Sequence, residues 1–172
     1  MKPLRTIFTR RSTTAFSTSS AVPGEDETLD LLRAAMSAPS HGKAKPWQFI
    51  IVKQAKTIKN LAILLKESPS LHDASMAIVV CADSLEQELA GHWAIDCSAA
   101  TENIILAAHA LDLGSKWCRI FPSKRKMKVI GDLFKTPLHI TPFSAVFLGE
   151  PAEARQKRAS SINSDQIHYE TW

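Results

Sequence analysis

The chain has 172 residues, 45% hydrophobic and 22% charged, with a formal net charge of +4 at pH 7. This length predicts one domain with its own hydrophobic core. Apolar runs are far shorter than the roughly 20 residues of a transmembrane helix, so we expect no membrane partner. Three widely spaced cysteines without a C-x-x-C pair favour a reduced, cytoplasmic setting, and six histidines without metal-ligand spacing predict no metal site.

One dense basic run, KRKMK at 124–128, raises the question of nucleic-acid binding. This run opens an amphipathic helical pattern with Met127, Ile130 and Leu133 on one side, so a solvated helix face explains it. A nucleic-acid-binding protein would show a broader basic face or a known module. We therefore expect no nucleic-acid partner.

The first half of the chain reads as alternating helices and strands. One or two helical turns are expected over residues 3–10, and a polar stretch follows. The acidic residues at 25–27 stand where the positive end of a helix dipole favours them, and they open a predicted helix over 26–37. The further elements of this half are a strand at 47–52, a helix at 57–67 and a doubly buried strand at 76–82.

The second half contains the longest helical pattern, at about 90–112. At ~1.5 Å per residue it would be about 35 Å long, so we expect it to form the central pillar of the domain, with Gly114 as its cap. A short strand or extended loop at 115–120, a helix at 123–134 and a strand at 143–149 follow. From Pro151 onward the periodicity is lost, which is typical of a tail that needs a partner surface to become ordered.

The N-terminus has two competing explanations. Residues 1–24 carry four positive side chains and no acid, and nine Ser or Thr residues lie between Thr6 and Ser20, which is typical of a transit peptide. Alternatively, Arg10, Arg11 and Ser12 can hold a phosphate group through charge-assisted hydrogen bonds. From the residues alone, three interpretations remain open: a surface charge, a targeting signal and a phosphate site.

Three further segments are candidates for ligand contact. APSHGKAKPW at 38–47 is a loop bracketed by prolines, in which small residues allow the backbone to approach a ligand. LGSKWCRIFP at 113–122 joins two helices and can line a pocket. Arg155, Lys157 and Arg158 are clustered cations after the last strand. Each segment is explained equally well by ordinary structure, as a connection, a strand or a solvated tail.

Taken together and in this order, these segments resemble the FMN-dependent nitroreductase family. The likeness lies in RRSTTAF at 10–16, APSHGKAKPWQFIIV at 38–52, the helix from Asp96 into LGSKW, IFP at 120–122, and FLGEP followed by Lys157-Arg158. It covers nearly the whole chain. The resemblance implies an α+β fold of the nitroreductase type, with a central, mostly antiparallel sheet flanked by helices. A single domain would span 1–172, and its C-terminal arm, 151–172, would wrap the partner subunit.

The resemblance also implies a homodimer with two FMN sites at the subunit interface. In the family, the arginine–serine motif lies near the N-terminus and binds the phosphate and ribityl chain of FMN, so we expect no removable leader before Arg10. Beyond the phosphate contacts, backbone groups around Arg119 and Ile120 would lie near the flavin ring. One subunit would supply Arg10, Arg11, Ser12 and Thr14 with Lys157 and Arg158, and the other would supply Pro39, Ser40, His41 and Lys43.

The chain departs from the family pattern at three positions. Lys43 and Lys45 replace a common Asn and Gln, and Thr14 replaces a common Lys or Arg. A cation near N1 and C2=O of a flavin stabilises the negative charge of the reduced ring. Because Thr14 cannot supply it, we form the hypothesis that Lys43 or Lys45 does.

The activity implied by the resemblance is transfer of hydride from NADH or NADPH through FMN to a nitroaromatic, a quinone or free flavin. Donor and acceptor would use one pocket in turn, which gives ping-pong kinetics. The reacting group belongs to the cofactor, so we expect no catalytic residue and no metal. Two alternatives remain: a flavin store or sensor with little turnover, and a basic binding module without flavin. Cys118 is interpreted as a packed, inert thiol.

Overall fold

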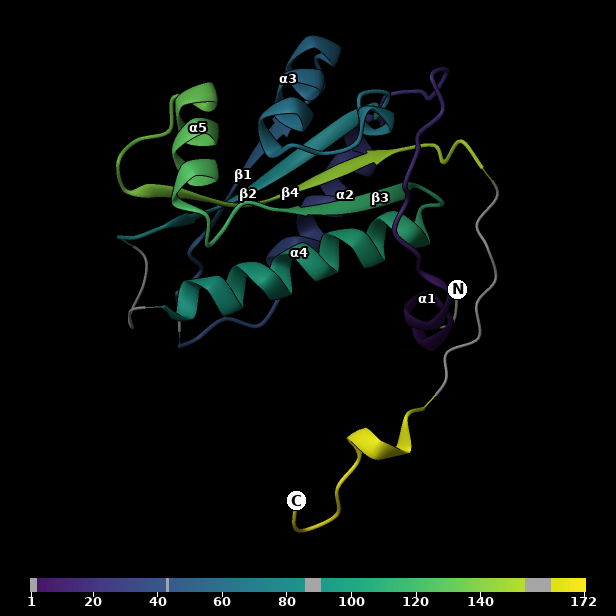
Figure 1. Cartoon of the computed structure of the whole chain (residues 1–172), viewed down its shortest axis with the longest axis vertical. Coiled ribbons are helices and arrows are strands. Elements are labelled where there is room, and N and C mark those ends of the chain that lie inside the picture. Colours follow the sequence, from purple (N-terminus) through teal and green to yellow (C-terminus); the bar gives the residue numbers. More distant parts are fainter. Residues whose placement is uncertain (1–2, 43, 86–90, 154–161) are drawn as a thin grey trace.

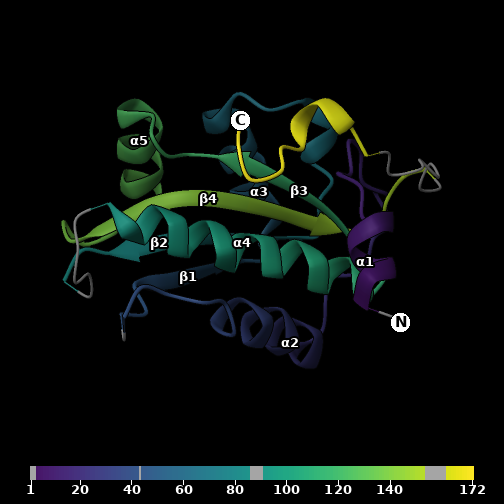
Figure 2. The same cartoon turned by 90° about the horizontal axis from the view of Figure 1, so that it is seen from below.

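The computed structural model describes residues 3–42, 44–85, 91–153 and 162–172. They form an α+β fold in which helices lie on both faces of one sheet (Figures 1 and 2). The helices are α1 (Pro3–Thr9), α2 (Glu25–Met36), α3 (Ala55–Leu65), α4 (His92–Ala110) and α5 (Lys124–Phe134). The strands are β1 (Trp47–Val52), β2 (Met76–Asp83), β3 (Gly114–Arg119) and β4 (Ile140–Gly149), and short 3-10 turns lie at Pro69–Leu71 and Ser164–Gln166.

The sheet has the order β1-β2-β4-β3, and every neighbouring pair is antiparallel. The expected antiparallel sheet flanked by helices is therefore confirmed. Strand β2 lies inside the sheet, and its residues alternate between two hydrophobic cores. This burial on both faces explains why its sequence is a continuous apolar run rather than an alternating one.

The helices divide into two layers. Helices α3 and α5 cover one face of the sheet, whereas α2 and α4 cover the other (Figure 1). Ile58 and Leu61 of α3 and Phe147 of β4 pack in the first core. Ile104 of α4 and Leu31 of α2 pack in the second. Helix α4 runs along the sheet as expected for a central pillar, with a length of about 28 Å for its 19 residues.

The prediction that Gly114 caps the long helix is wrong. The left-handed residue after α4 is Asp112, with φ of 60°, and the N–H of Leu113 donates to the carbonyl of Ala108 at 2.8 Å. Gly114 instead opens β3, where a Cβ would lie 2.6 Å from Oγ1 of Thr13. A close approach of two chain segments, and not a helix end, requires glycine there.

The last strand begins earlier than expected. Strand β4 starts at Ile140 rather than at residue 143, although Pro142 lies inside it. Pro142 pairs with Cys81, next to a register shift between Val80 and Cys81. Proline has no N–H for the ladder, and an irregularity of this kind accommodates it.

The C-terminal segment 162–172 is exposed throughout and lies away from the sheet and helices in Figure 1. Ile162, Tyr169 and Trp172 are large apolar side chains with at least 83% of their surface exposed. Its role as a dimer arm stays a prediction. Within the described ranges, no helix combines the length and the apolar character that a bilayer span requires.

Candidate functional site

The arginine–serine motif follows α1, whose end is held against the end of α4. Oγ1 of Thr9 lies 2.8 Å from Nε2 of His109 in the last turn of α4. Directly after α1, Nη1 of Arg11 donates to the carbonyls of Phe8 and Arg10, at 3.0 and 2.6 Å. These bonds place the Arg11 guanidinium at the carboxyl end of α1, next to half-buried Arg10.

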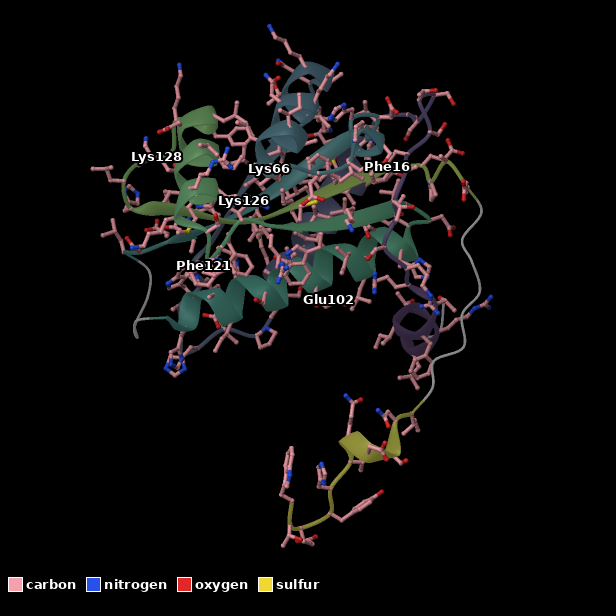
Figure 3. All side chains as sticks on the ribbon, in the orientation of Figure 1. Phe16, Lys66, Glu102, Phe121, Lys126 and Lys128 are labelled. Atoms are coloured by element: carbon pink, nitrogen blue, oxygen red, sulfur yellow. The ribbon has the colours of Figure 1, made fainter. Side chains whose placement is uncertain are left out.

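The residues after the motif lie beside the beginning of β3 and the end of β4. Ser12 forms a parallel bridge with Ser115, and the N–H of Thr13 donates to the carbonyl of Ser115 at 2.8 Å. Buried Phe16 bridges Pro151 (Figure 3). The sequence motif is therefore fixed to the sheet at the corner where β3 begins.

A polar cavity of about 360 Å³ lies next to this corner. We call it the Thr14 cavity. The segment after α3 forms one wall, and Oγ of Ser70 in that segment donates to the carbonyl of Thr14 at 2.6 Å. Its lining residues are Thr14, Ala15, Glu67, Ser68, Ser70, Leu71 and Lys116.

An apolar cavity of about 260 Å³, the Trp117 cavity, lies on the α4 side of the sheet. Phe121 contacts Trp93 with ring centroids 4.8 Å apart and stacks on Phe143 at 6.0 Å. Nε1 of Trp117 is buried and has no hydrogen-bond partner among the described residues. The cavity is lined by Ala94, Ile95, Ser98, Trp117, Arg119, Phe121 and Phe143.

Strand β3 separates the two cavities. Its side chains alternate between the faces of the sheet, so Lys116 reaches the Thr14 cavity while Trp117 and Arg119 reach the Trp117 cavity. The strand pairs with β4 on one side. On its other side, the described residues offer one bridge, from Ser12 to Ser115. A planar ligand with a hydrogen-bonding rim can pair with such an open strand edge.

The loop after α2 lies at the opposite end of α4. The N–H of His41 donates to both carboxylate oxygens of buried Asp96, at 3.2 and 3.3 Å, and the ring of His41 makes an edge contact with His92. Pro39 is exposed and Ser40 is half-buried in the same loop. The carboxylate of Asp96 therefore fixes the loop backbone to the first turns of α4.

One chain does not bring all the predicted site residues together. His41 contacts α4 at Asp96, whereas Thr9, directly before the arginine motif, contacts α4 at His109, which is 13 residues further along. Thirteen residues of helix span about 20 Å. The loop 38–41 and the motif 10–12 therefore lie at opposite ends of the same helix (Figure 1).

The remaining predicted residues are placed as follows. Arg119 is exposed, and its carbonyl accepts a bond at 3.3 Å from Nζ of Lys126 on α5 (Figure 3). Ile120 is buried, with its N–H donating to Phe143 and its carbonyl accepting from Ser123. Both main-chain groups of Ile120 are therefore used inside the chain. Lys43, Lys157 and Arg158 lie outside the described residues.

Cys118 lies on the buried side of β3. Burial raises the pKa of its thiol to about 12, and the nearby negative charge of Glu67 adds to this effect while Lys116 opposes it. The thiol is thus protonated at neutral pH and is a poor nucleophile. Among the described residues, no group of three acidic, histidine or cysteine side chains is arranged to hold a metal.

The lining residues not named individually from the sequence include Glu67, Lys116 and Trp117, although the last two lie in the segment 113–122 that was expected to line a pocket. A signal for the last two was present, because alternation along a strand at 115–120 puts neighbouring residues on opposite faces. For Glu67 there was no such signal, since its position follows from the packing of the segment after α3 against β3.

Comparison with known proteins identifies relatives across the whole chain. The model of the Nitroreductase family matches residues 7–93. A protein of Archaeoglobus fulgidus, provisionally named NADH dehydrogenase/NAD(P)H nitroreductase, is 40% identical over 98% of both chains. The FMN reductase (NADPH) of Bacillus subtilis is 22% identical over 98% of this chain and 74% of that protein.

Solved structures agree with the fold. The crystal structure of a provisionally named NADH oxidase from Clostridium acetobutylicum superimposes with a TM-score of 0.91 and 33% sequence identity. The match covers 97% of this chain and 99% of the other.

Proposed function

The chain belongs to the nitroreductase family of oxidoreductases, and we propose that it binds FMN and transfers hydride from NADH or NADPH to a small acceptor. The names of the archaeal relative, which includes NAD(P)H, and of the Bacillus relative, which includes FMN, support this assignment. The acceptors we propose are nitroaromatics, quinones and free flavin. The cytoplasmic location stays a prediction.

One structural observation carries the proposal: the open edge of β3 lies between a polar and an apolar cavity, with the arginine motif at its beginning. This arrangement suits a molecule that has an anionic end, a polar chain and a planar ring. Arg10, Arg11 and Ser12 would bind the phosphate. Thr14 and the main chain near Arg119 would bind the ring system. Lys157 and Arg158 would add positive charge near the phosphate.

A second copy of the chain would complete the site. Pro39, Ser40 and His41 lie about 20 Å along α4 from the arginine motif of their own chain, so they would serve the FMN of the partner, together with Lys43. The exposed apolar residues of 162–172 would cover the partner surface. We therefore propose a homodimer with FMN at the interface.

Bound FMN would supply the hydride chemistry, accepting hydride from the nicotinamide and passing it to the acceptor. The residues of the chain would bind the cofactor and the substrates, orient them, and exclude water from the site. Trp117, Phe121 and Phe143 line an apolar cavity that favours a planar aromatic donor or acceptor. We propose that donor and acceptor occupy this cavity in turn, with ping-pong kinetics.

The test is FMN uptake followed by anaerobic reduction of the full chain. We expect quenching of flavin fluorescence at one FMN per chain, a dimer by light scattering, and loss of the yellow colour with NADH or NADPH. Double substitution of Arg10 and Arg11 by Ala should weaken FMN affinity at least tenfold. Arg125→Ala, an exposed cation on α5, serves as the control.

Absence of FMN uptake overturns the proposal. FMN uptake without reduction by either nicotinamide supports a flavin store or sensor instead. Reduction followed by reoxidation with a nitroaromatic or a quinone, with parallel double-reciprocal plots, supports the ping-pong oxidoreductase.

A further inference from the structure

The Thr14 cavity contains a pair of opposite charges. Among the described residues that line it, Lys116 is the cation and Glu67 is the anion. Both side chains are half-buried: Lys116 lies on β3, and Glu67 lies between α3 and the turn at Pro69–Leu71. The remaining polar lining residues are hydroxyl-bearing and neutral. The formal charge of the cavity therefore depends on these two residues.

A second observation places both charges near one point of β3. Cys118 lies two residues after Lys116, on the same face of the strand. Glu67 raises the pKa of the Cys118 thiol and Lys116 lowers it, so both charges lie close enough to act on this thiol. The two charged groups thus lie on the same side of β3, within interaction distance of a buried residue of that strand.

This pair matches the rim of a flavin ring. The pyrimidine side of the ring presents an N–H donor between two carbonyl acceptors, so it pairs with one carboxylate and with neighbouring donors. At neutral pH, transfer of one hydride equivalent adds two electrons and one proton to the ring. One negative charge then remains, shared by N1 and C2=O. A cation at that position favours the reduced ring.

We infer that Lys116 supplies the positive charge that raises the electron affinity of the flavin, and that Glu67 accepts the hydrogen bond of the ring N–H. The inference rests on the proposed function and names one cation of the same site. It competes with the sequence hypothesis that Lys43 or Lys45 has this role. Lys45 precedes β1, at the edge of the sheet opposite β3, so it would reach an FMN beside β3 only from the partner subunit.

The experiment measures the midpoint potential of the bound FMN by anaerobic spectroelectrochemistry in the full-length holoprotein. Lys116→Met should weaken binding of reduced relative to oxidised FMN at least tenfold, which is a fall of about 30 mV for a two-electron couple. Lys116→Arg should keep the wild-type potential. Lys128→Met is the matched control, because Lys128 is exposed on α5 and pairs with Asp132 at 2.9 Å (Figure 3).

A rescue variant separates charge from structure. Thr14 lines the same cavity, so Thr14→Lys in the Lys116→Met background should restore the potential. Glu67→Gln should raise the potential, since it removes a negative charge, and should weaken binding of oxidised FMN. Circular dichroism and thermal unfolding of each variant confirm that the fold is retained.

Failure of the inference is distinct from failure of the proposed function. If the wild-type chain takes up no FMN, the proposed function is wrong. If it takes up FMN and Lys116→Met has the potential of Lys128→Met, the inference is overturned and the proposed function stands. A fall in potential in Lys45→Met with no fall in Lys116→Met also overturns the inference and returns the role to the loop.

Discussion

Thr9 and His109 join the first helix to the last turn of the longest one, with Oγ1 of Thr9 2.8 Å from Nε2 of His109. The hydroxyl of Thr9 also donates to the carbonyl of Arg5 at 2.7 Å. Because a hydroxyl has a single hydrogen, Nε2 of His109 must carry the proton and donate to Thr9. This bond fixes where the arginine motif begins.

Thr9→Val should remove this bond while conserving the shape of the side chain. We expect a loss of about 1 kcal/mol in the free energy of unfolding, and FMN affinity lowered severalfold because Arg10 and Arg11 follow directly. Urea denaturation and fluorescence titration measure the two effects. Thr136→Val, after α5, is the control; an equal loss of FMN affinity in both variants contradicts the assigned role.

Asp96→Ala should release the loop that contains His41. The carboxylate accepts the N–H of His41 at 3.2 and 3.3 Å, and its loss leaves that N–H to solvent. We expect FMN affinity to fall about tenfold, since a hydrogen bond to a charged group contributes about 1.5–3 kcal/mol. Asp96→Asn retains one acceptor oxygen, so its FMN affinity should fall less than that of Asp96→Ala. Equal affinities for all three proteins would show that the loop position does not affect the site.

Gly114→Ala should be strongly destabilising. The added Cβ would lie 2.6 Å from Oγ1 of Thr13 and 3.0 Å from the carbonyl oxygen of Gly149, so both segments must move. We expect the free energy of unfolding, measured by urea denaturation, to fall by about 1–3 kcal/mol. At Gly24, the nearest atom to an added Cβ is 3.8 Å away, and Gly24→Ala should cost less. If Gly24→Ala were the more destabilising of the two substitutions, the contact between Thr13 and β3 would be loose.

Trp117→Phe should change ligand binding more than stability. The indole N–H is buried without a partner among the described residues, so its removal leaves no acceptor unpaired in the free chain. We expect a change in the free energy of unfolding below about 1 kcal/mol, and a KM for a quinone raised severalfold. A KM equal to that of the wild type would indicate that the Trp117 cavity does not take the acceptor.

Alkaline pH should destabilise the chain through its buried thiols. Burial raises the pKa of Cys81, Cys97 and Cys118 from 9.0 to about 12 in the folded state. Above pH 9 the unfolded chain loses these protons and the folded chain keeps them, so stability is full below pH 9 and is lost as the pH rises toward 12.

Each thiol contributes a slope of up to about 1.4 kcal/mol per pH unit in this window. Urea denaturation between pH 8.5 and 10.5, in steps of about half a unit, measures the total slope. Cys118→Ala should reduce the slope of the free energy of unfolding against pH. The stability of this variant at pH 8, which is lower than that of the wild type, is the reference for its own slope. A slope unchanged by this substitution contradicts the stated cause.

The order and type of the elements could be predicted from the sequence because local patterns define them. The continuous apolar run at 76–82 is β2, whose residues are buried on both faces, and the 3–4 spacing after His92 is α4. The end of α4 could not be predicted, because the left-handed residue is Asp112 while Gly114 is required by Thr13, a residue about 100 positions away in the chain. Sequence patterns do not report such long-range contacts.

The features of the candidate site likewise divide into those that local sequence patterns define and those that long-range contacts define. The sequence by itself determined the fold class, the family resemblance and the motif at 10–12, since these depend on residue types at short spacings. The tertiary structure decided that Lys116 and Glu67 share a cavity with Thr14, and that the loop at 38–41 lies about 20 Å along α4 from the arginine motif. The physical reason is that packing of the N-terminal segment against β3, and contacts of Thr9 and His41 with α4, set these distances. Such packing depends on contacts between residues far apart in the chain, which local spacing does not encode.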